Sequence, residues 1–191
     1  MNIVKNIIEH TTQTVSILQQ GKTILYPTDT IWGIGCDATN ETAVEKIFDI
    51  KNRPKKKSLI VLVDSIEMLK KYVIVTPEIE SMLASFELPV TVIYPNPKGL
   101  APNVVNADNT IAIRIVNHDF CRQLIQQFGN PIVSTSANIS GEKNPVSFED
   151  ISTAIKKKVD FIADKKFDTS VYKFPSKLIK ISADNSIQYL R

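Results

Sequence analysis

The chain has 191 residues, of which 43% are hydrophobic and 23% are charged, and its formal net charge at pH 7 is +3. These proportions are ordinary for a globular protein, and they exclude an intrinsically disordered, collagen-like or disulfide-scaffold chain. The length fits one domain, residues 1–191, with enough chain to bury a sizeable core. A net charge this small identifies no partner, because what matters is where the cations gather along the chain.

Cysteine usage and the lack of long apolar segments predict a cytoplasmic protein with no membrane-bound part. Cys36 and Cys121 lie far apart in the sequence and form neither a C-x-x-C pair nor a zinc-ligand spacing, so we expect two reduced thiols. The first ten residues lack the cationic and apolar regions of a secretory signal. The longest apolar run, Leu59 to Val63, has five residues, whereas a membrane helix needs about 18.

The first half of the chain alternates between helical and extended patterns. Apolar residues at helical spacing between Ile3 and Leu18 predict one or two N-terminal helices, and Gly21 is a suitable stop. The run at 59–63 predicts a strand buried on both faces. The other elements expected here are a strand at 23–26 halted by Pro27, an extended segment at 31–36, an amphipathic helix from about Asn40, and helices at 65–71 and 77–86.

The second half continues this alternation. A helix is expected from Ser147 as its cap, with Lys156 to Lys158 in the last turn, where cations favour the helix dipole. The other expected elements are strands at 90–94, 110–116, 132–134, near 162, 178–181 and 187–190, and a helix at 118–128 ended by Gly129. Strands and helices that alternate irregularly predict an α/β or mixed α+β fold, with flanking helices on a twisted mixed sheet.

The first segment with chemical potential is Tyr26 to Asp37. A strand ends at Pro27, and the next three residues are a hydroxyl, a carboxylate and a hydroxyl, Thr28 to Thr30. Such short polar side chains either bind a small ligand or cap a turn. The segment also reads Gly33-x-Gly35-x-x-Ala38, which leaves a dinucleotide-binding enzyme as a weak alternative to glycines that allow a close backbone approach.

The second segment, Lys51 to Lys57, has five cations in seven residues. Lys51 continues the apolar face of the preceding helix, so its ammonium either reaches out of the edge of the core or points into a cleft. Because the buried strand follows at once, this cationic loop is expected at a strand edge, where ligands gather in open α/β sheets. The sequence therefore indicates a polyphosphate ligand, against the alternative of a solvated lysine face.

The third and fourth segments are also strand-linked. Ser134 to Gly141 combines four hydroxyls, an amide and a glycine after a short apolar strand, which is typical of a loop that offers donors to phosphate oxygens. On the strand that begins at Thr110, Arg114 alternates with apolar residues. An inward-facing arginine requires an anionic partner, either a substrate carboxylate or a buried aspartate.

These four segments together resemble the YrdC/TsaC family of threonylcarbamoyl-AMP synthases, in its short single-domain bacterial branch. The family's marks correspond here to Pro27–Gly35, Lys51–Pro54, Thr110–His118 and Ser134–Gly141, and the resemblance extends from about Gly21 to Arg191. The sequence departs from the family pattern at Leu62, Leu88 and Lys177. The resemblance implies a YrdC-like fold with a positively charged concave cleft.

The resemblance also implies a reaction. L-threonine, bicarbonate or CO2, and ATP would give threonylcarbamoyl-AMP and pyrophosphate, and a partner enzyme would pass the threonylcarbamoyl group to the adenosine beside the anticodon of tRNA. Lys51 and Arg53 would be the catalytic cations on the ATP phosphates, with Mg²⁺ bridging those phosphates. Asp29 and Asp37 are candidate outer partners of that ion, and no direct metal ligand is identified.

The resemblance assigns the remaining site residues by substrate. For ATP they are Lys51, Arg53, Lys57, Thr110, Ser136, Asn138, Asn144 and Arg191, and for threonine Thr30, Arg114, Ser134 and Ser176. A protein of 191 residues would hold only the catalytic domain, so the tRNA-facing step is expected to need a separate protein.

The main alternative is a YrdC-like RNA-binding protein without independent adenylyl transfer. Its footprint for tRNA or double-stranded RNA would be formed by the basic runs 51–57, 156–158 and 165–166.

Overall fold

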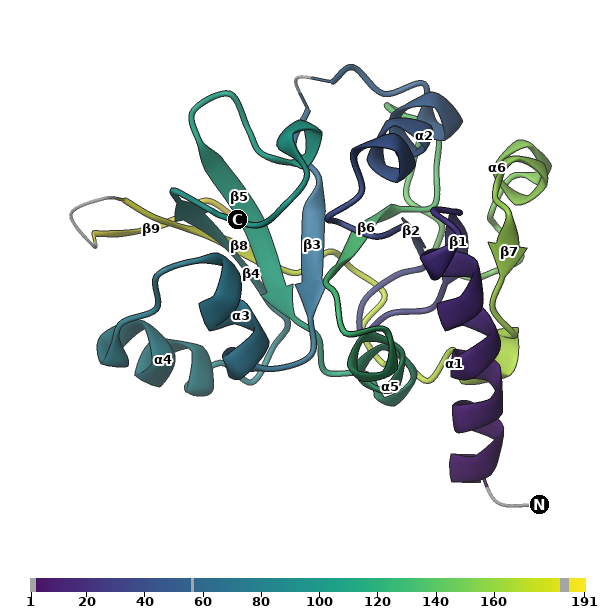
Figure 1. The fold of residues 1–191 in the computed structure, drawn as a ribbon, viewed down its shortest axis with the longest axis horizontal. Helices are drawn as coiled ribbons and strands as arrows, with labels where there is room; N and C mark the ends of the chain where they lie inside the picture. The colour runs from purple at the N-terminus through teal and green to yellow at the C-terminus, as the bar shows by residue number, and fades with distance from the viewer. Residues whose placement is uncertain (1–2, 56, 183–185) are drawn as a thin grey trace.

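The structure is a computed structural model, and it describes residues 3–55, 57–182 and 186–191. Met1 and Lys56, which belong to segments considered above, lie outside the described residues. In the described part of the chain, nine strands form one sheet in the order β7-β1-β2-β6-β3-β5-β4-β8-β9 (Figure 1).

The sheet is mixed, as predicted. The pairs β1–β7, β3–β5 and β4–β8 are parallel, and the other neighbouring pairs are antiparallel. The strands are β1 Ile24–Tyr26, β2 Gly33–Gly35, β3 Ile60–Val63, β4 Val90–Pro95, β5 Thr110–Ile115, β6 Ile132–Ser136, β7 Phe161–Ile162, β8 Lys177–Ile181 and β9 Ile187–Tyr189.

Helices flank this sheet, and α1 packs against α5. In Figure 1, α2 and α6 lie in the upper right of the view, and α3, α4 and α5 lie in its lower part. The helices are α1 Ile3–Gln19, α2 Glu41–Lys51, α3 Ile66–Tyr72, α4 Pro77–Ala84, α5 Asp119–Phe128 and α6 Thr153–Lys158, with 3-10 helices at Pro102–Val104 and Lys165–Phe167. None of the helices within the described residues combines the length and the apolar character that a bilayer span requires.

Several predicted boundaries are confirmed because they depend on local chemistry. The Asn40 side chain caps α2 by accepting a hydrogen bond of 3.0 Å from the Ala43 amide. Gly21 and Gly129 follow α1 and α5 with φ of +65° and +80°, in the left-handed region that glycine adopts without strain. Val61 to Val63, in the middle of the sheet, are fully buried as the apolar run predicted.

The predicted start of α6 is wrong. Ser147 does not cap a helix, because its hydroxyl and amide both donate to Asp150 Oδ2, at 2.9 and 2.8 Å, which closes a local turn. The helix begins at Thr153, and Ser152 caps it by accepting from the Ile155 amide at 3.3 Å. The lysines of the last turn, 156–158, are placed as expected.

Only part of the extended segment at 31–36 is a strand. The Thr28 hydroxyl donates to the Ile31 carbonyl at 2.8 Å, which holds the preceding residues in a turn, and β2 begins at Gly33. A Cβ on Gly35 would lie 2.4 Å from the Val133 carbonyl oxygen. Gly33 and Gly35 therefore allow close packing within the sheet. Because β2 is antiparallel to both of its neighbours, it is not the parallel strand of a dinucleotide fingerprint.

Candidate functional site

A polar cavity of about 240 Å³ lies against the strands β2, β3, β5 and β6. Register places Arg114 beside Leu62 and Ser134 beside Ile60, so these side chains share one face of the sheet. Three arginines, Arg53, Arg114 and Arg191, line the cavity, and no aspartate or glutamate of the described residues does. The cavity is therefore suited to an anionic ligand.

The cavity brings together most of the residues predicted for the site. All four residues expected to hold threonine line it, and so do four of those expected to hold ATP. They are Thr30, Arg114, Ser134 and Ser176, and Arg53, Ser136, Asn144 and Arg191. Lys51, Lys57, Thr110 and Asn138 lie outside its lining. The set of residues predicted for threonine is thus brought together more completely than the set predicted for ATP.

Arg114, the inward-facing arginine of β5, pairs with a buried aspartate, which is one of the two partners that the sequence allowed. Arg114 Nη2 lies 3.0 Å from Asp29 Oδ1, and both side chains are at most 5% exposed. The same Nη2 donates to Thr30 Oγ1 at 3.4 Å. Since Arg114 also lines the cavity, a carboxylate partner on the protein side does not exclude a second anion on the cavity side.

Lys51 supports a loop and does not line the cavity. Its ammonium donates to the carbonyl of Ser136 and, at 2.6 Å, to that of Asn138. Burial and the neighbouring Arg53 lower the pKa of Lys51 to about 7, whereas the two carbonyl acceptors favour the charged form and oppose that shift. The ammonium thus fixes the backbone of the 136–138 loop, whose residue Ser136 lines the cavity.

The basic loop, residues 51–57, contains residues that line the cavity and residues that do not. Arg53 lines the cavity and donates to the Ser58 carbonyl at 2.6 Å, and burial lowers its pKa. Lys57 donates to Ser140 Oγ at 3.3 Å, which ties the basic loop to the 134–141 loop. Lys55 points away, into an ion pair of 2.6 Å with Glu45. Only part of this cationic run is therefore available to a ligand in the cavity.

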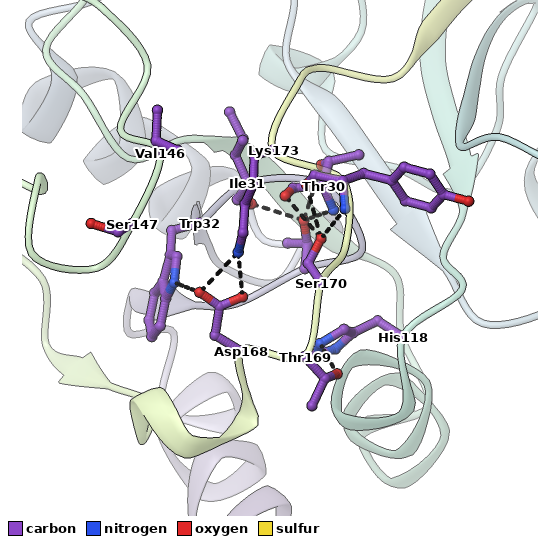
Figure 2. A network of polar contacts seen from close by, with 12 residues as sticks. Thr30, Ile31, Trp32, His118, Val146, Ser147, Asp168, Thr169, Ser170 and Lys173 are labelled. Carbon is purple, nitrogen blue, oxygen red and sulfur yellow. Dashed lines mark hydrogen bonds and ion pairs between the residues drawn. The ribbon is translucent and has the colours of Figure 1, made fainter.

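A segment that sequence reasoning left as a loop closes one side of the site. Figure 2 shows Asp168 between Trp32 and Lys173, and the Trp32 indole donates to Asp168 Oδ2 at 2.9 Å. Ser170 Oγ donates to the Thr30 carbonyl at 3.0 Å. We call residues 168–176 the strap. It ends at Ser176, whose hydroxyl pairs with Thr91 Oγ1 at 2.7 Å.

For Trp32 and Thr91, the sequence itself indicates that the side chain needs a buried hydrogen-bond partner. Trp32 stands inside a predicted site segment, and its indole requires an acceptor when it is buried, as it is here. Thr91 is a single hydroxyl in the apolar run Val90 to Ile93 and is fully buried. A polar residue at such a position signals a buried partner, but it does not say which residue that partner is.

Thr110 and Asn138, two of the residues expected to contact the nucleotide, form hydrogen bonds with residues close to them in sequence. Thr110 Oγ1 donates to Asp108 Oδ1 at 2.6 Å and accepts from Asn106. Asn138 Nδ2 donates to the carbonyls of Ile139 and Glu142, while its buried Oδ1 has no hydrogen-bond partner among the described residues. Asn138 therefore keeps one acceptor for a ligand.

The protein supplies no cluster of metal ligands in its described part. No group of three or more histidine, cysteine or acidic side chains is placed there to hold an ion. Asp29 is paired with Arg114, and Asp37 accepts from the amide and hydroxyl of Thr39 at 2.8 and 2.7 Å. The residues present do not fit a protein-built Mg²⁺ site, and neither aspartate lines the cavity.

A second, larger cavity of about 550 Å³ lies on the other face of the sheet. Its walls are mainly apolar and come from α4, the segment that follows it, and strand residues such as Ile113 and Ile115. It shares none of its lining residues with the first cavity, although it reaches Asp29, which pairs with Arg114. The smaller cavity is the better candidate site because it contains the convergent polar groups that orient a ligand.

Comparison with known proteins identifies the family. A sequence model of the Sua5/YciO/YrdC family, described as "Telomere recombination", matches residues 16–191. The chain belongs to the Sua5/YciO/YrdC family. The fold of this Sua5/YciO/YrdC chain, a mixed α/β sheet with flanking helices, agrees with that of E. coli YciO, which superposes with a TM-score of 0.80 at 23% identity and covers 96% of this chain and 89% of that chain.

Relatives of this Sua5/YciO/YrdC protein carry the name threonylcarbamoyl-AMP synthase. One, from Pseudoalteromonas translucida (strain TAC 125), is 35% identical over 79% of this chain and 83% of that protein. Another, from Vibrio cholerae, is 32% identical over 97% and 98%. P. abyssi Sua5 complexed with L-threonine is 30% identical, with a TM-score of 0.76 over 89% of this chain. This chain spans about half the length of that Sua5 chain, 50%.

Proposed function

We propose that this protein is a threonylcarbamoyl-AMP synthase, a nucleotidyltransferase that condenses L-threonine, bicarbonate or CO2, and ATP into threonylcarbamoyl-AMP and pyrophosphate. The observation that carries the proposal is the polar cavity, where three arginines and several hydroxyls meet without an aspartate or glutamate of the described residues. Membership of the Sua5/YciO/YrdC family and the names of the relatives support it. The single continuous sheet supports treating residues 1–191 as one domain.

The threonine end of the cavity has the groups that an amino acid requires. Arg114 is a buried cation for the substrate carboxylate, and the hydroxyls of Thr30, Ser134 and Ser176 surround it in the lining. Burial strengthens such contacts because the local dielectric is low. We assign these four residues to threonine.

The nucleotide end depends on Arg53 and Arg191. Both line the cavity beside Ser136 and Asn144, so they are placed to neutralise phosphate oxygens. Lys51 acts through the 136–138 backbone, which it holds by two carbonyl contacts. We keep Lys57, Thr110 and Asn138 as ATP contacts that a bound nucleotide would engage beyond the cavity itself.

The reaction requires alignment more than covalent help from the protein. The neutral threonine amine attacks CO2 and loses a proton to solvent as the carbamate forms, and a carbamate oxygen then attacks the α-phosphorus of ATP. The bond to the β-phosphate oxygen breaks, and pyrophosphate leaves with its electron pair. Because both reactants are anions, arginines that neutralise and align them supply the main catalytic effect. We propose that ATP binds as its Mg²⁺ complex, with the ion held by the phosphates.

The product is a reactive mixed anhydride, so we propose that a separate tRNA-modifying enzyme in the cytoplasm consumes it. Direct tRNA or double-stranded RNA binding remains a secondary proposal. The cations that would form its footprint are partly engaged, since Lys165 pairs with Glu149 at 3.1 Å and Lys166 with Asp164 at 3.0 Å. These pairs lower the charge that the surface offers to a phosphate backbone.

The test is pyrophosphate release from ATP and bicarbonate with and without L-threonine. We expect release that depends on threonine, and we expect Arg53→Ala to remove most of it. Lys55→Ala is the matched control, because Lys55 belongs to the same basic run but pairs with Glu45 at the surface. Release that ignores threonine would overturn the assignment. Salt-dependent tRNA binding that is indifferent to ATP, without synthesis, would instead favour an RNA-binding protein.

A further inference from the structure

The ion pair between Asp29 and Arg114 is a feature that substrate binding alone does not explain. Asp29 is 4% exposed and does not line the polar cavity, whereas Arg114 does. The carboxylate therefore stands behind the arginine, on the side away from the ligand. Burying an aspartate there costs free energy unless the carboxylate is paired and hydrogen-bonded, so its contacts indicate its role.

Asp29 connects three parts of the fold. Its Oδ1 lies 3.0 Å from Arg114 Nη2 in an ion pair that does not have hydrogen-bond geometry, and its Oδ2 accepts from the Asn117 amide at 3.2 Å. The Thr28 hydroxyl fixes the turn that carries Asp29 by accepting from the Thr30 amide at 3.1 Å. The carboxylate thus links the turn after β1 to the end of β5 and to the connection that leads into α5.

The pairing leaves part of the guanidinium free. Arg114 Nη2 is shared between Asp29 and Thr30 Oγ1, while Arg114 Nε is buried without a hydrogen-bond partner among the described residues. An arginine presents its donors in a rigid plane, so fixing one edge also fixes the direction of the others. A buried donor without a partner is costly, so the Arg114 guanidinium keeps hydrogen-bonding capacity that Asp29 and Thr30 do not use, and the side chain lines the cavity.

We infer that Asp29 is a positioning residue, which holds the Arg114 guanidinium so that its free donors are presented to the carboxylate of the amino-acid substrate. The inference rests on the proposed function for the identity of that substrate. A different role for Asp29 makes the opposite prediction. If Asp29 only neutralised Arg114 and competed with the substrate, removing its charge would strengthen threonine binding.

The experiment compares wild type with Asp29→Asn and Asp29→Glu, and Asp119→Asn serves as the matched acid control. Asp119 is exposed in the first turn of α5 and outside the cavity lining. The first readout is the NMR signal of the Arg114 Nε–H group, assigned with Arg114→Lys. The second is the KM for L-threonine and for ATP in pyrophosphate release. Thermal unfolding of each variant reports whether the fold is kept.

We expect one Arg114 Nε–H signal in wild type, broadened or shifted in Asp29→Asn and partly restored in Asp29→Glu. We expect Asp29→Asn to raise the KM for threonine by about 10-fold to 100-fold, as for the loss of a hydrogen bond to a charged group, with little change in the KM for ATP. An unchanged Nε–H signal, or a lower KM for threonine, would overturn the inference. If wild type shows no threonine dependence, the proposed function fails, and the NMR comparison still decides whether Asp29 positions Arg114.

If Asp29→Asn does not fold, a double-mutant cycle decides the question with Asp29→Ala in the wild-type and Arg114→Ala backgrounds. Positioning through Arg114 predicts a large loss of threonine affinity in the first background and almost none in the second. Equal losses in both would show that Asp29 acts on the substrate or on the fold by another route.

Discussion

The buried ammonium of Lys51 predicts a specific dependence of stability on pH. Lys51 is 1% exposed, and burial beside Arg53 lowers its pKa from 10.5 to about 7 in the folded protein. Between these two values the unfolded chain binds a proton that the folded chain does not, so the free energy of unfolding rises with pH. Below about pH 7 Lys51 is charged in both states, and its contribution no longer changes.

The size of the effect follows from the same values. A pKa difference between 10.5 and about 7 corresponds to about 5 kcal/mol, at about 1.36 kcal/mol for each pH unit. The carbonyls of Ser136 and Asn138 stabilise the ammonium and reduce this figure. We therefore expect about 2 kcal/mol of added stability between pH 7 and pH 9 from this side chain alone.

The assay is urea unfolding of wild type and Lys51→Met between pH 6 and pH 9, followed by the fluorescence of the buried Trp32. The diagnostic quantity is the difference in free energy of unfolding between the two proteins. Burial raises the pKa of the Cys36 and Cys121 thiols, and this effect lowers the free energy of unfolding as pH rises. Both proteins share that effect, so the subtraction removes it. Methionine is chosen because it keeps the length of the side chain without its charge.

Two results would refute this reasoning. A difference that stays constant from pH 6 to pH 9 would show that the two carbonyls keep the pKa of Lys51 near its ordinary value. A similar pH dependence in Lys55→Met would show that the effect is general, since Lys55 is exposed and its partner Glu45 raises the pKa of that ammonium.

Four further substitutions test the fold and the strap. Ser152→Ala should lower the free energy of unfolding by about 1 kcal/mol through loss of the α6 cap, whereas Ser147→Ala should leave the helix intact. Circular dichroism and urea unfolding measure both effects. Equal loss of helix in the two variants would show that α6 begins at Ser147 after all. Gly35→Ala should destabilise by about 3 kcal/mol, because its Cβ would lie 2.4 Å from a carbonyl oxygen; a wild-type unfolding midpoint would contradict that packing. Asp168→Asn should weaken the bond from the Trp32 indole and raise the KM for threonine about fivefold, whereas a changed KM for ATP alone would show that the strap serves the nucleotide.

The sequence predicts the fold well wherever the signal is local. The apolar run of β3, the Asn40 cap and the two left-handed glycines each depend on a few neighbouring residues, and each is confirmed. Ser147 fails for the same reason, because Ser147 and Ser152 both offer a capping hydroxyl. The choice between them is made by Asp150, which captures the first serine in a turn.

The site is less predictable, because the direction of a side chain depends on residues far away in sequence. The motifs select residues that line the cavity, among them Thr30, Arg53 and Arg114. They do not show that Lys51 turns toward carbonyls 85 and 87 positions along the chain. Apart from Ser176, they also leave the strap unassigned, because its bonds to Trp32 and Thr30 join segments separated by well over 100 residues.

The cations of the site therefore have separate tasks, which their sequence spacing conceals. Lys51 is held by backbone carbonyls and Arg114 is paired with Asp29, so neither side chain is a wholly unpaired charge. Arg53 and Arg191 donate to backbone carbonyls, of Ser58 and Ser176, and neither forms an ion pair with an acidic side chain of the described residues. Neutral acceptors orient a guanidinium without cancelling its field, so we propose that the attraction for the ATP phosphates concentrates at these two arginines. For the paired Arg114 we propose that it instead supplies direction, which a substrate as small as threonine needs more than it needs charge.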